Sequence, residues 1–323
     1  MKAVIIDLGY ADYEPEKAAA KSAGAELVLA GCKSQAEVLE ACRDADAIAV
    51  RQSVIDRRAI DAMTRCRIIA RYGIGVDNVD LKAAGEKGIY ATNVTTYCLD
   101  EVAEQALALL LAAARKVILH DRFLRQGKWD MGPSEKLYRI QGRTLGLVGL
   151  GQIPRRLVKK VRGFSFRILA YDPYVSEEEM KKLGVGKADL ETVLGESDYV
   201  SLHAAVTPET TDLMNEARLR LMKPTAILVN TSRGALVDEA ALAKVLREKR
   251  IACACLDVYK TEPLEKDSPL RGLENCILTD HCAWYSEESI IDLQQAVADQ
   301  MAIALKGGEP PSVVNRKYLK RKA

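Results

Sequence analysis

The sequence predicts an α/β protein built from two doubly wound parallel-sheet domains with a cleft between them. Short, nearly continuous apolar runs alternate with longer segments of helical periodicity, and such runs are typical of strands buried on both faces of a parallel sheet. The runs form two sets, one within residues 1–95 and the other beginning at residue 144. A chain of 323 residues is also too long for one ordinary hydrophobic core, so we expect two domains.

The apolar runs predict the strands in chain order. In the first set they are "AVIID", "AELVLA", "ADAIAV", "RIIAR" and "GIYATNV". In the second set they are "TLGLVGL", "FRILAYD", "SDYVSLH", "AILVNT", "IACACLDV" and "CILTDH". Helical segments separate the strands within each set, which predicts repeated βα units and one parallel sheet in each domain.

A long helical pattern, Cys98–Trp129, separates the two sets. Acidic residues near its start, Asp100 and Glu101, suit the positive end of a helix dipole. Its middle is apolar nearly all round, so we expect a helix buried between domains or at a subunit interface. A second helical pattern, Ser286–Lys306, follows the last strand, and the chain could cross back to the first domain there.

The composition argues against several classes of partner. The net charge of +2 is too small for a nucleic-acid-binding surface. The most apolar stretch, Ala106–Ala114, is about half as long as a membrane span, and the N-terminus lacks a signal-peptide pattern. The eight cysteines show no metal-ligand spacing, so we expect small buried thiols and no metal site. We therefore expect a cytoplasmic protein that binds neither nucleic acid nor membranes.

The stretch "LGLVGLGQIPRR", Leu145–Arg156, nearly matches the Gly-x-Gly-x-x-Gly turn of a dinucleotide-binding, or Rossmann-like, domain. Gly149 and Gly151 follow a predicted strand and precede a helical segment, and Asp172 ends the next strand, 21 residues after Gly151. An acid at that place would accept a hydrogen bond from a ribose hydroxyl and repel a 2′-phosphate. The arrangement predicts an NAD site and favours NAD over NADP.

Pro154 stands where this pattern has its third glycine. In a first helical turn the missing N–H costs little, because that donor has no intrahelical partner. Proline pushes the preceding Ile153 away from helical angles, and its ring replaces a residue that allows close helix–strand packing. We expect the site to persist with a shifted helix start; the alternative is seriously weakened cofactor binding.

Three predicted strand ends in the second set carry side chains suited to acid–base chemistry. Arg233 follows a strand and suits a bidentate contact with a carboxylate. Glu262 and His281 follow later strands, and the carboxylate would raise the pKa of His281 and keep it a usable acid near neutrality. Taken singly, each has a purely structural alternative. On one nucleotide-binding sheet they are expected to act together.

The stretch "RYGIGVDNVD", Arg71–Asp80, allows an anion-binding nest in the first domain. Gly73 and Gly75 permit backbone N–H groups to point together, although an ordinary glycine-rich turn has the same composition. Arg51, at the end of another predicted strand, would add a positive group. We expect Arg51, Arg71 and this nest to contact the substrate.

These motifs resemble those of the D-isomer-specific 2-hydroxyacid dehydrogenases, in the same order and over essentially the whole chain. The matching stretches are "RYGIGVDNVD", "TLGLVGLGQI", "AYDPY", "VNTSRGALVDEAAL", "CLDVYKTEP" and "DHCAWYSEES". The run "AWYSEES" is similar to the branch that includes the C-terminal-binding proteins. The resemblance implies a flavodoxin-like substrate domain of residues 1–97 and 286–323, an NAD domain of residues 98–285, and a homodimer joined through the NAD domains.

By position, the resemblance also implies individual roles. Arg233, Glu262 and His281 fall on the catalytic residues, and Asp172 falls on the ribose-binding acid. Further implied contacts are Asp257 with the nicotinamide amide, the backbone of Ile74 and Gly75 with the substrate carboxylate, and Trp284 in the active site. The remaining implied cofactor contacts are Gly149, Gly151, Gln152, Ile153, Thr207, Thr231 and Ser232. Asp280 replaces a proline usual before the catalytic histidine, which removes no reacting group.

We therefore expect an NAD-dependent oxidoreductase that interconverts a small 2-oxo acid and its D-2-hydroxy acid. Two alternatives stay open. One is an NAD(H)-binding corepressor-like or scaffolding protein with weak activity, motivated by "AWYSEES" and Pro154. The other is a 3-phosphoglycerate dehydrogenase-like enzyme without a regulatory domain, in which Arg51 would hold the distal phosphate.

Overall fold

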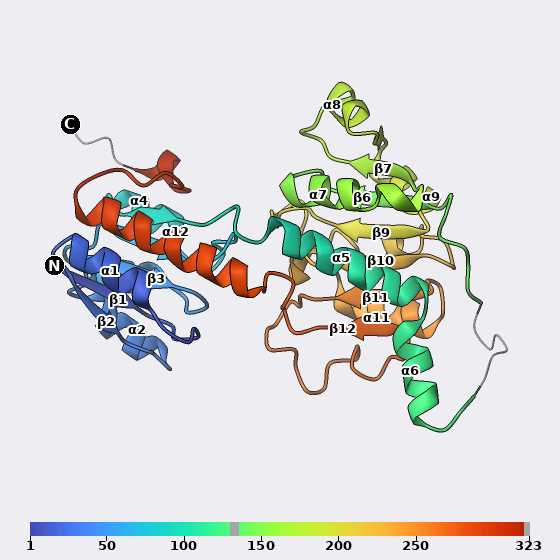
Figure 1. The fold of residues 1–323 in the computed structure, drawn as a ribbon, viewed down its shortest axis with the longest axis horizontal. Coiled ribbons are helices and arrows are strands. Elements are labelled where there is room, and N and C mark those ends of the chain that lie inside the picture. Colours follow the sequence, from blue (N-terminus) through green and yellow to red (C-terminus); the bar gives the residue numbers. More distant parts are fainter. Residues whose placement is uncertain (130–135, 320–323) are drawn as a thin grey trace. The chain divides into compact units, whose positions relative to one another are not determined.

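A computed structural model describes residues 1–129 and 136–319 of the chain (Figure 1). The chain divides into two compact units, Met1–Cys98 with Ser286–Ala323, and Leu99–Tyr285. Each unit contains one parallel sheet with helices packed on it. The predicted class, two parallel-sheet α/β domains, is therefore confirmed.

The first unit has a five-stranded sheet with the order β2-β1-β3-β4-β5. Its elements are β1 (Lys2–Ile5), α1 (Glu14–Ser22), β2 (Glu26–Leu29), α2 (Gln35–Cys42), β3 (Ala47–Val50), α3 (Arg57–Ala62), β4 (Ile68–Arg71), α4 (Leu81–Glu86), β5 (Tyr90–Thr92), α12 (Glu287–Leu305) and the 3-10 turn η3 (Arg316–Tyr318). The middle strands β3 and β4 are buried almost throughout, because both faces of the sheet are covered.

Helix α12 returns the chain to the first unit, as the helical pattern after the last strand predicted. It packs beside α1 and against β3 and β4 (Figure 1). A capping box between Ser286 and Ser289 fixes where it begins. Buried polar contacts join it to α1, since Gln294 donates to the Glu16 carboxylate at 3.2 Å.

The second unit has a seven-stranded sheet with the order β12-β11-β10-β9-β6-β7-β8. Its elements are α5 (Leu99–Ala114), α6 (Val117–Arg125), β6 (Thr144–Val148), α7 (Gln152–Lys160), η1 (Arg162–Phe164), β7 (Arg167–Tyr171), α8 (Glu177–Lys182), β8 (Gly186–Lys187), α9 (Leu190–Glu196), β9 (Tyr199–Leu202), α10 (Glu216–Leu219), β10 (Ile227–Asn230), η2 (Gly234–Leu236), α11 (Glu239–Arg247), β11 (Cys253–Leu256) and β12 (Cys276–Leu278). The strand order reverses between β6 and β9, which is where ligands of such sheets bind.

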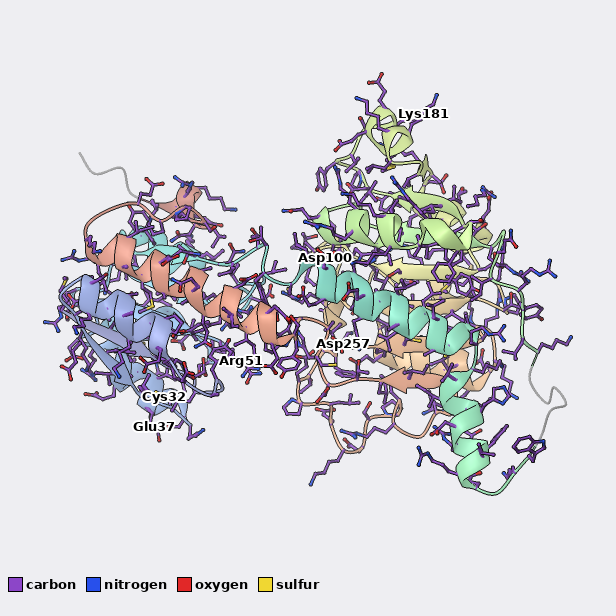
Figure 2. The ribbon with its side chains drawn as sticks, in the orientation of Figure 1. Cys32, Glu37, Arg51, Asp100, Lys181 and Asp257 are labelled. Carbon is purple, nitrogen blue, oxygen red and sulfur yellow. The ribbon has the colours of Figure 1, made fainter. Side chains whose placement is uncertain are left out.

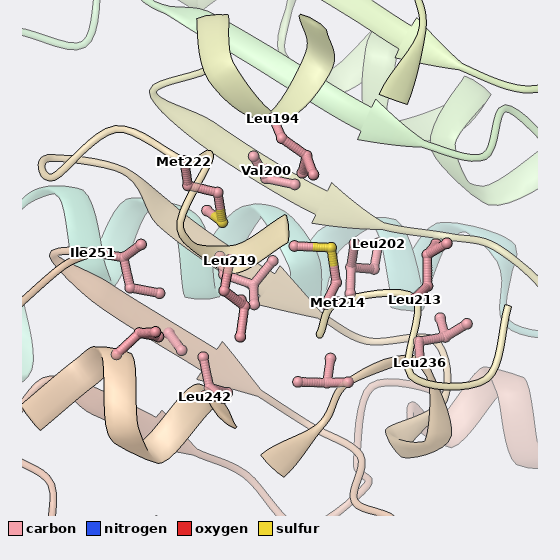
Figure 3. Close-up of a cluster of buried hydrophobic side chains, with 14 of the residues drawn as sticks. Leu194, Val200, Leu202, Leu213, Met214, Leu219, Met222, Leu236, Leu242 and Ile251 are labelled. Carbon is pink, nitrogen blue, oxygen red and sulfur yellow. The ribbon is translucent and has the colours of Figure 1, made fainter. Parts of the chain in front are cut away.

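Two apolar clusters hold this sheet between its helices. One lies on the side of α9, α10 and α11 and includes Leu202 and Leu242 (Figure 3). The other lies on the side of α5 and α7 and includes Leu110 and Leu147. Because both faces are packed, a ligand can reach the sheet only at the ends of its strands, and in sheets of this kind it binds at the carboxyl ends.

The structure differs from the sequence prediction at two elements. The pattern Cys98–Trp129 is not one helix: α5 ends at Ala114, and Lys116, in a left-handed conformation with φ 53°, precedes α6. Helix α5 buries one side, whereas α6 has no buried residue. The two-residue edge strand β8 was not predicted, because "GK" has no apolar periodicity.

The expectation that Pro154 shifts the start of its helix was wrong. Helix α7 begins at Gln152, directly after Gly151, and Pro154 is its buried third residue. The first helical hydrogen bond, from the Arg155 N–H to the Gly151 carbonyl, comes one residue later. Proline therefore occupies the last position whose N–H would have had no intrahelical partner.

None of the described helices is long and apolar enough to cross a membrane. All eight cysteines carry free thiols, and several are buried, as predicted. In the described part of the chain no group of histidine, cysteine and acidic residues is arranged to hold a metal ion.

Truncating a side chain in the apolar cluster of Figure 3 should destabilise the second unit strongly. Leu202 lies on the central strand β9 and is fully buried, so Leu202→Ala should cost about 2–5 kcal/mol. The control Leu221→Ala alters a side chain that is 45% exposed and should cost less than about 0.5 kcal/mol. Urea unfolding followed by circular dichroism measures both, and equal losses would contradict the assigned core.

Candidate active site

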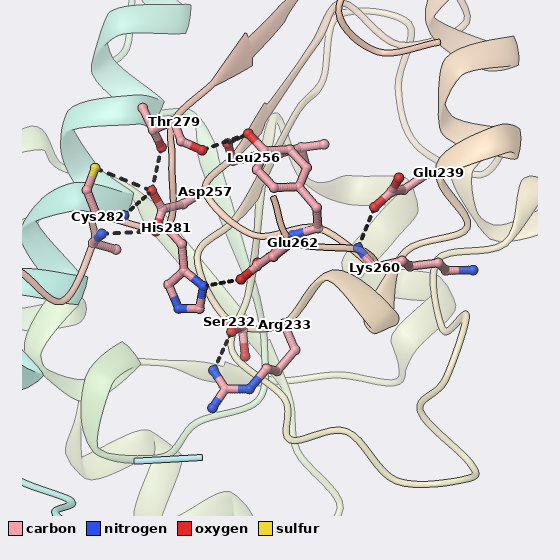
Figure 4. Close-up of polar contacts among 12 residues, drawn as sticks. Ser232, Arg233, Glu239, Leu256, Asp257, Lys260, Glu262, Thr279, His281 and Cys282 are labelled. Carbon is pink, nitrogen blue, oxygen red and sulfur yellow. Dashed lines mark hydrogen bonds and ion pairs between the residues drawn. The ribbon is translucent and has the colours of Figure 1, made fainter. Parts of the chain in front are cut away.

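The three predicted acid–base residues lie on loops that leave neighbouring strands. Arg233 follows β10, Glu262 follows β11 and His281 follows β12, and these strands are adjacent and parallel. Their carboxyl ends therefore meet at one edge of the sheet, and Figure 4 shows the three side chains together there. The sequence placed each residue at a strand end, and the topology brings them to one site.

The Arg233 loop is fixed by its own polar groups and by a glycine. The Asn230 side chain donates to the Arg233 carbonyl at 2.9 Å and accepts from the Ser232 N–H at 3.1 Å. Gly234 packs directly on the Tyr259–Lys260 peptide, where an added Cβ would lie only 1.9 Å from the Tyr259 carbonyl carbon. Only glycine allows this approach, so Gly234 brings the Arg233 loop against the loop that carries Glu262.

Glu262 and His281 form a directly hydrogen-bonded pair (Figure 4). His281 Nδ1 lies 2.6 Å from Glu262 Oε2, and the other carboxylate oxygen accepts from the Tyr259 N–H at 3.0 Å. The carboxylate is thus held at both oxygens. Since Nδ1 faces the carboxylate, Nε2 is the nitrogen left to exchange a proton with a substrate.

The charge balance around Glu262 favours its ionised form. Burial acts to raise the pKa of this carboxyl group, but hydrogen bonds from His281 and from the Tyr259 N–H act against it. The positive charges of His281 and Arg233 add to these, and the net effect is a pKa below the ordinary value. Glu262 is therefore a carboxylate at neutral pH, suited to stabilise a charged imidazole beside it.

Asp257 holds the turn that carries His281. Its side chain is fully buried and accepts from the Thr279 hydroxyl at 2.5 Å, the Cys282 N–H at 3.1 Å and the Ala283 N–H at 3.0 Å. Between these anchors His281 has φ 57°, a left-handed conformation that costs most residues about 1–3 kcal/mol. The carboxylate of Asp257 offsets this strain and fixes the direction of the imidazole ring.

The glycine turn of the second unit has the features that a dinucleotide needs. Gly149 has φ 95°, and an added Cβ would lie 2.9 Å from the His203 carbonyl group. At Gly151, which precedes α7, an added Cβ would meet no atom within 4 Å, so the backbone is open to close approach. Helix α7 directs unpaired N–H groups toward this opening, which suits a pyrophosphate.

Two further observations fit a bound nucleotide. Asp172, after β7, accepts from the Leu150 N–H at 2.8 Å, which fixes an acid beside the glycine turn. The buried hydroxyl of Thr231 has no hydrogen-bond partner among the described residues, and such a group costs about 1–3 kcal/mol unless a ligand or water meets it. The residues present therefore fit a dinucleotide.

The other predicted cofactor contacts occupy loops around the same sheet edge. Gln152 and Ile153 form the first turn of α7, and Thr207 lies on the loop after β9. The Ser232 hydroxyl donates to the Ala204 carbonyl at 2.8 Å, which links the loops after β9 and β10. His203, at the end of β9, contacts the Ser201 hydroxyl, and burial lowers its pKa to about 4. His203 is therefore neutral at physiological pH.

The predicted substrate residues of the first unit follow neighbouring strands there. Arg51, labelled in Figure 2, comes after β3, and Arg71 ends β4. The Arg51 guanidinium lies 5.8 Å from the centroid of the Tyr10 ring. The loop with Ile74 and Gly75 is held because the Asn93 amide donates to the Ile74 carbonyl at 2.7 Å. Trp284 belongs to the second unit, where its ring packs edge-on against that of Tyr285.

Sequence reasoning missed three residues that shape these loops. Asp7 accepts from the N–H groups of Arg51 at 2.6 Å and Ser53 at 3.1 Å; its place at the end of "AVIID" was the signal that could have found it. Tyr259 donates to the Thr279 carbonyl at 2.7 Å, and Thr279 binds Asp257. Neither of these two contacts has a spacing signature, because each joins loops that are distant in sequence.

The comparisons with known proteins agree with this geometry. Residues 107–283 match the model of the D-isomer specific 2-hydroxyacid dehydrogenase NAD binding domain. A glyoxylate reductase of Korarchaeum cryptofilum is 44% identical over 292 residues, which are 89% of this chain and 88% of the relative. A D-3-phosphoglycerate dehydrogenase of Archaeoglobus fulgidus is 36% identical over 90% of this chain, which spans 55% of that relative.

A solved structure extends the likeness to the fold. The glyoxylate reductase from Paecilomyes thermophila superposes with a TM-score of 0.87 at 27% identity, covering 98% of each chain. The family resemblance inferred from the motifs is thus confirmed by independent sequence and structure comparisons. The chain belongs to the D-isomer-specific 2-hydroxyacid dehydrogenase family and is an oxidoreductase that uses a nicotinamide dinucleotide.

Proposed function

We propose that this protein reduces small 2-oxo acids, with glyoxylate as the first substrate to test, through Arg233, Glu262 and His281. The observation that carries the proposal is the 2.6 Å pair between His281 Nδ1 and Glu262 Oε2, which leaves Nε2 for a substrate. A protein that only binds a dinucleotide has no need of this acid. The similarity to glyoxylate reductases supports the choice of substrate.

The proposed roles follow from charge and geometry. His281 Nε2 donates a proton to the carbonyl oxygen as the alcohol forms, and Glu262 stabilises the imidazolium before transfer. Arg233 binds the substrate carboxylate and polarises the carbonyl group. The glycine turn and Asp172 would hold NADH, and the cofactor would supply the hydride for C2 of the substrate, which the chain only positions.

The first unit is proposed to complete the substrate site, and the second to be the NAD domain. Arg51, Arg71 and the backbone at Ile74 and Gly75 would contact the acid, with Trp284 beside it. We propose that Asp172 favours NAD over NADP, since its carboxylate is fixed at the turn by the Leu150 N–H. The motif "AWYSEES" supports placement in the branch with the C-terminal-binding proteins, and the free thiols support a cytoplasmic location.

We also propose a homodimer joined through the second unit. Helix α6 has no buried residue, although it carries several apolar side chains. Val117 and Leu124 are each more than half exposed, and Ile118 is exposed beside Val117. A helix that presents apolar side chains in this way is typical of a covered interface. A second copy of the chain is the simplest occupant, because closed symmetric dimers are the commonest assembly.

His281→Gln should lower kcat for glyoxylate reduction by about 10²–10⁴-fold, because the proton donor is lost. The dissociation constant of NADH should stay within about twofold, since the ring is not a cofactor anchor. His120→Gln, which alters an exposed histidine of α6, is the matched control and should leave kcat unchanged. Stopped-flow NADH absorbance and fluorescence titration give the two readouts.

A panel of glyoxylate, pyruvate and phosphohydroxypyruvate separates the alternatives. Clear NADH binding without oxidation of NADH by any of the three would contradict the enzyme proposal and favour the binding protein. If the protein is the phosphoglycerate dehydrogenase-like enzyme, Arg51→Ala should reduce kcat/KM for phosphohydroxypyruvate selectively. An equal loss on pyruvate would count against that second candidate.

The carboxyl group of Glu262 should titrate below 4.5, its ordinary value, in a ¹³C NMR titration assigned with Glu262→Gln. A lowered pKa means that the stabilisation from the ionised Glu262 carboxylate is fully present at neutral pH and is lost only as the pH falls through the lowered value. In His281→Gln the midpoint should rise, because the charge of His281, which helps to lower the pKa against the effect of burial, is lost. An unchanged midpoint in His281→Gln would show that the hydrogen bond to His281 does not lower the pKa of Glu262.

Leu124→Arg should weaken the dimer, because it places a charge on the exposed apolar side of α6. Sedimentation velocity should then show a concentration-dependent shift toward the monomer. Leu221→Arg, which changes another exposed leucine, 45% accessible and outside α6, is the control. A monomeric parent protein, or a dimer insensitive to Leu124→Arg, would overturn the assignment.

A further inference from the structure

In the glycine turn of the second unit, the N–H and the carbonyl group of Leu150 both form hydrogen bonds with side chains. The Leu150 N–H donates to Asp172 Oδ2 at 2.8 Å, and the Leu150 carbonyl accepts from Arg155 Nε at 2.9 Å. Leu150 itself is fully buried in the apolar cluster beneath the turn. The peptide groups on either side of this residue are therefore fixed by two side chains from different elements.

Arg155 carries this contact because of where helix α7 begins. The Gly151 carbonyl accepts the first helical hydrogen bond, from the Arg155 N–H at a long 3.3 Å. The Leu150 carbonyl lies one residue earlier, so no helical N–H can reach it. The side chain of Arg155 turns back and supplies the missing donor, directly after Pro154.

The second arm of the same guanidinium reaches another element of the site. Arg155 Nη2 pairs with Glu179 Oε1 at 2.7 Å, and Glu179 is in the first turn of α8. Helix α8 follows β7 and Asp172, so the guanidinium ties the glycine turn to the segment after the ribose-binding acid. A planar guanidinium makes both contacts at once, whereas a lysine ammonium makes only one well.

We propose that Arg155 is a positioning residue for the dinucleotide: it holds the Leu150–Gly151 peptide in its binding shape in a turn where proline has replaced the third glycine. The proposal rests on cofactor binding by this turn. Arg155 acts on the nucleotide through the backbone and is not itself a phosphate ligand. The turn is then preorganised before the nucleotide arrives.

The first test uses the protein without nucleotide. In Arg155→Met, which keeps the apolar stem, amide hydrogen exchange of a peptide spanning residues 146–157 should become faster, because the grip on Leu150 is lost. Arg156→Met is the matched control: Arg156 makes an ion pair of similar length, 2.9 Å to Asp100 Oδ2, without touching the turn. The control should leave exchange in this peptide unchanged.

The second test measures NADH binding by fluorescence titration with no substrate present. Arg155→Met should raise the dissociation constant about five- to tenfold, as expected for one lost charge-assisted contact at a partly exposed site. Arg155→Lys should recover only part of the lost NADH affinity, and Glu179→Gln should raise the dissociation constant by less than Arg155→Met does.

Two results would overturn the proposal. Weaker NADH binding with unchanged exchange in the nucleotide-free turn would make Arg155 a direct ligand instead. Unchanged binding in Arg155→Met, with or without a loss of stability, would leave it a surface ion pair. Because both readouts are taken without a 2-oxo acid, failure of the proposed substrate would not affect either of them.

Discussion

The candidate site depends above all on the buried carboxylate of Asp257. It directly follows β11 and accepts hydrogen bonds from Thr279, Cys282 and Ala283, on both sides of His281. A fully buried carboxylate is costly unless its hydrogen bonds are satisfied, so this turn and the end of the strand stabilise each other. The left-handed conformation of His281 follows from that pairing, and with it the direction of the ring toward Glu262.

Hydrogen bonds and close backbone packing also hold the neighbouring loops of the site to one another. Tyr259 donates its hydroxyl to the Thr279 carbonyl and its N–H to Glu262, so one residue fixes both members of the acid–base pair. Gly234 then presses the Arg233 loop onto the Tyr259 peptide. Positive, negative and titratable groups are thus set in place by backbone contacts before any ligand binds. Such preorganisation is the main means by which a protein stabilises developing charge.

Much of the fold and the identity of the reacting groups were predictable from sequence. Continuous apolar runs identify strands buried on both faces, and polar residues at their ends, Arg233, Glu262 and His281, stand out because strands of this kind otherwise lack charge.

The break at Lys116 was not predictable, because the apolar pattern continues across it. The structural role of Asp257 was also hidden, since its partners are more than 20 residues away along the chain. Pro154 does not displace the start of α7. A proline is costly in a helix where it replaces a hydrogen-bonded N–H, and an N–H at this position would have no partner within the helix.

A crystal structure of the protein with NAD and oxamate, an unreactive analogue of a 2-oxo acid, tests the central claim most directly. The account predicts the oxamate carboxylate on the Arg233 guanidinium and its amide oxygen within about 3.2 Å of His281 Nε2. It also predicts that the Glu262–His281 hydrogen bond persists in the complex. Oxamate bound away from Arg233, or with His281 turned so that Nε2 faces Glu262, would contradict it.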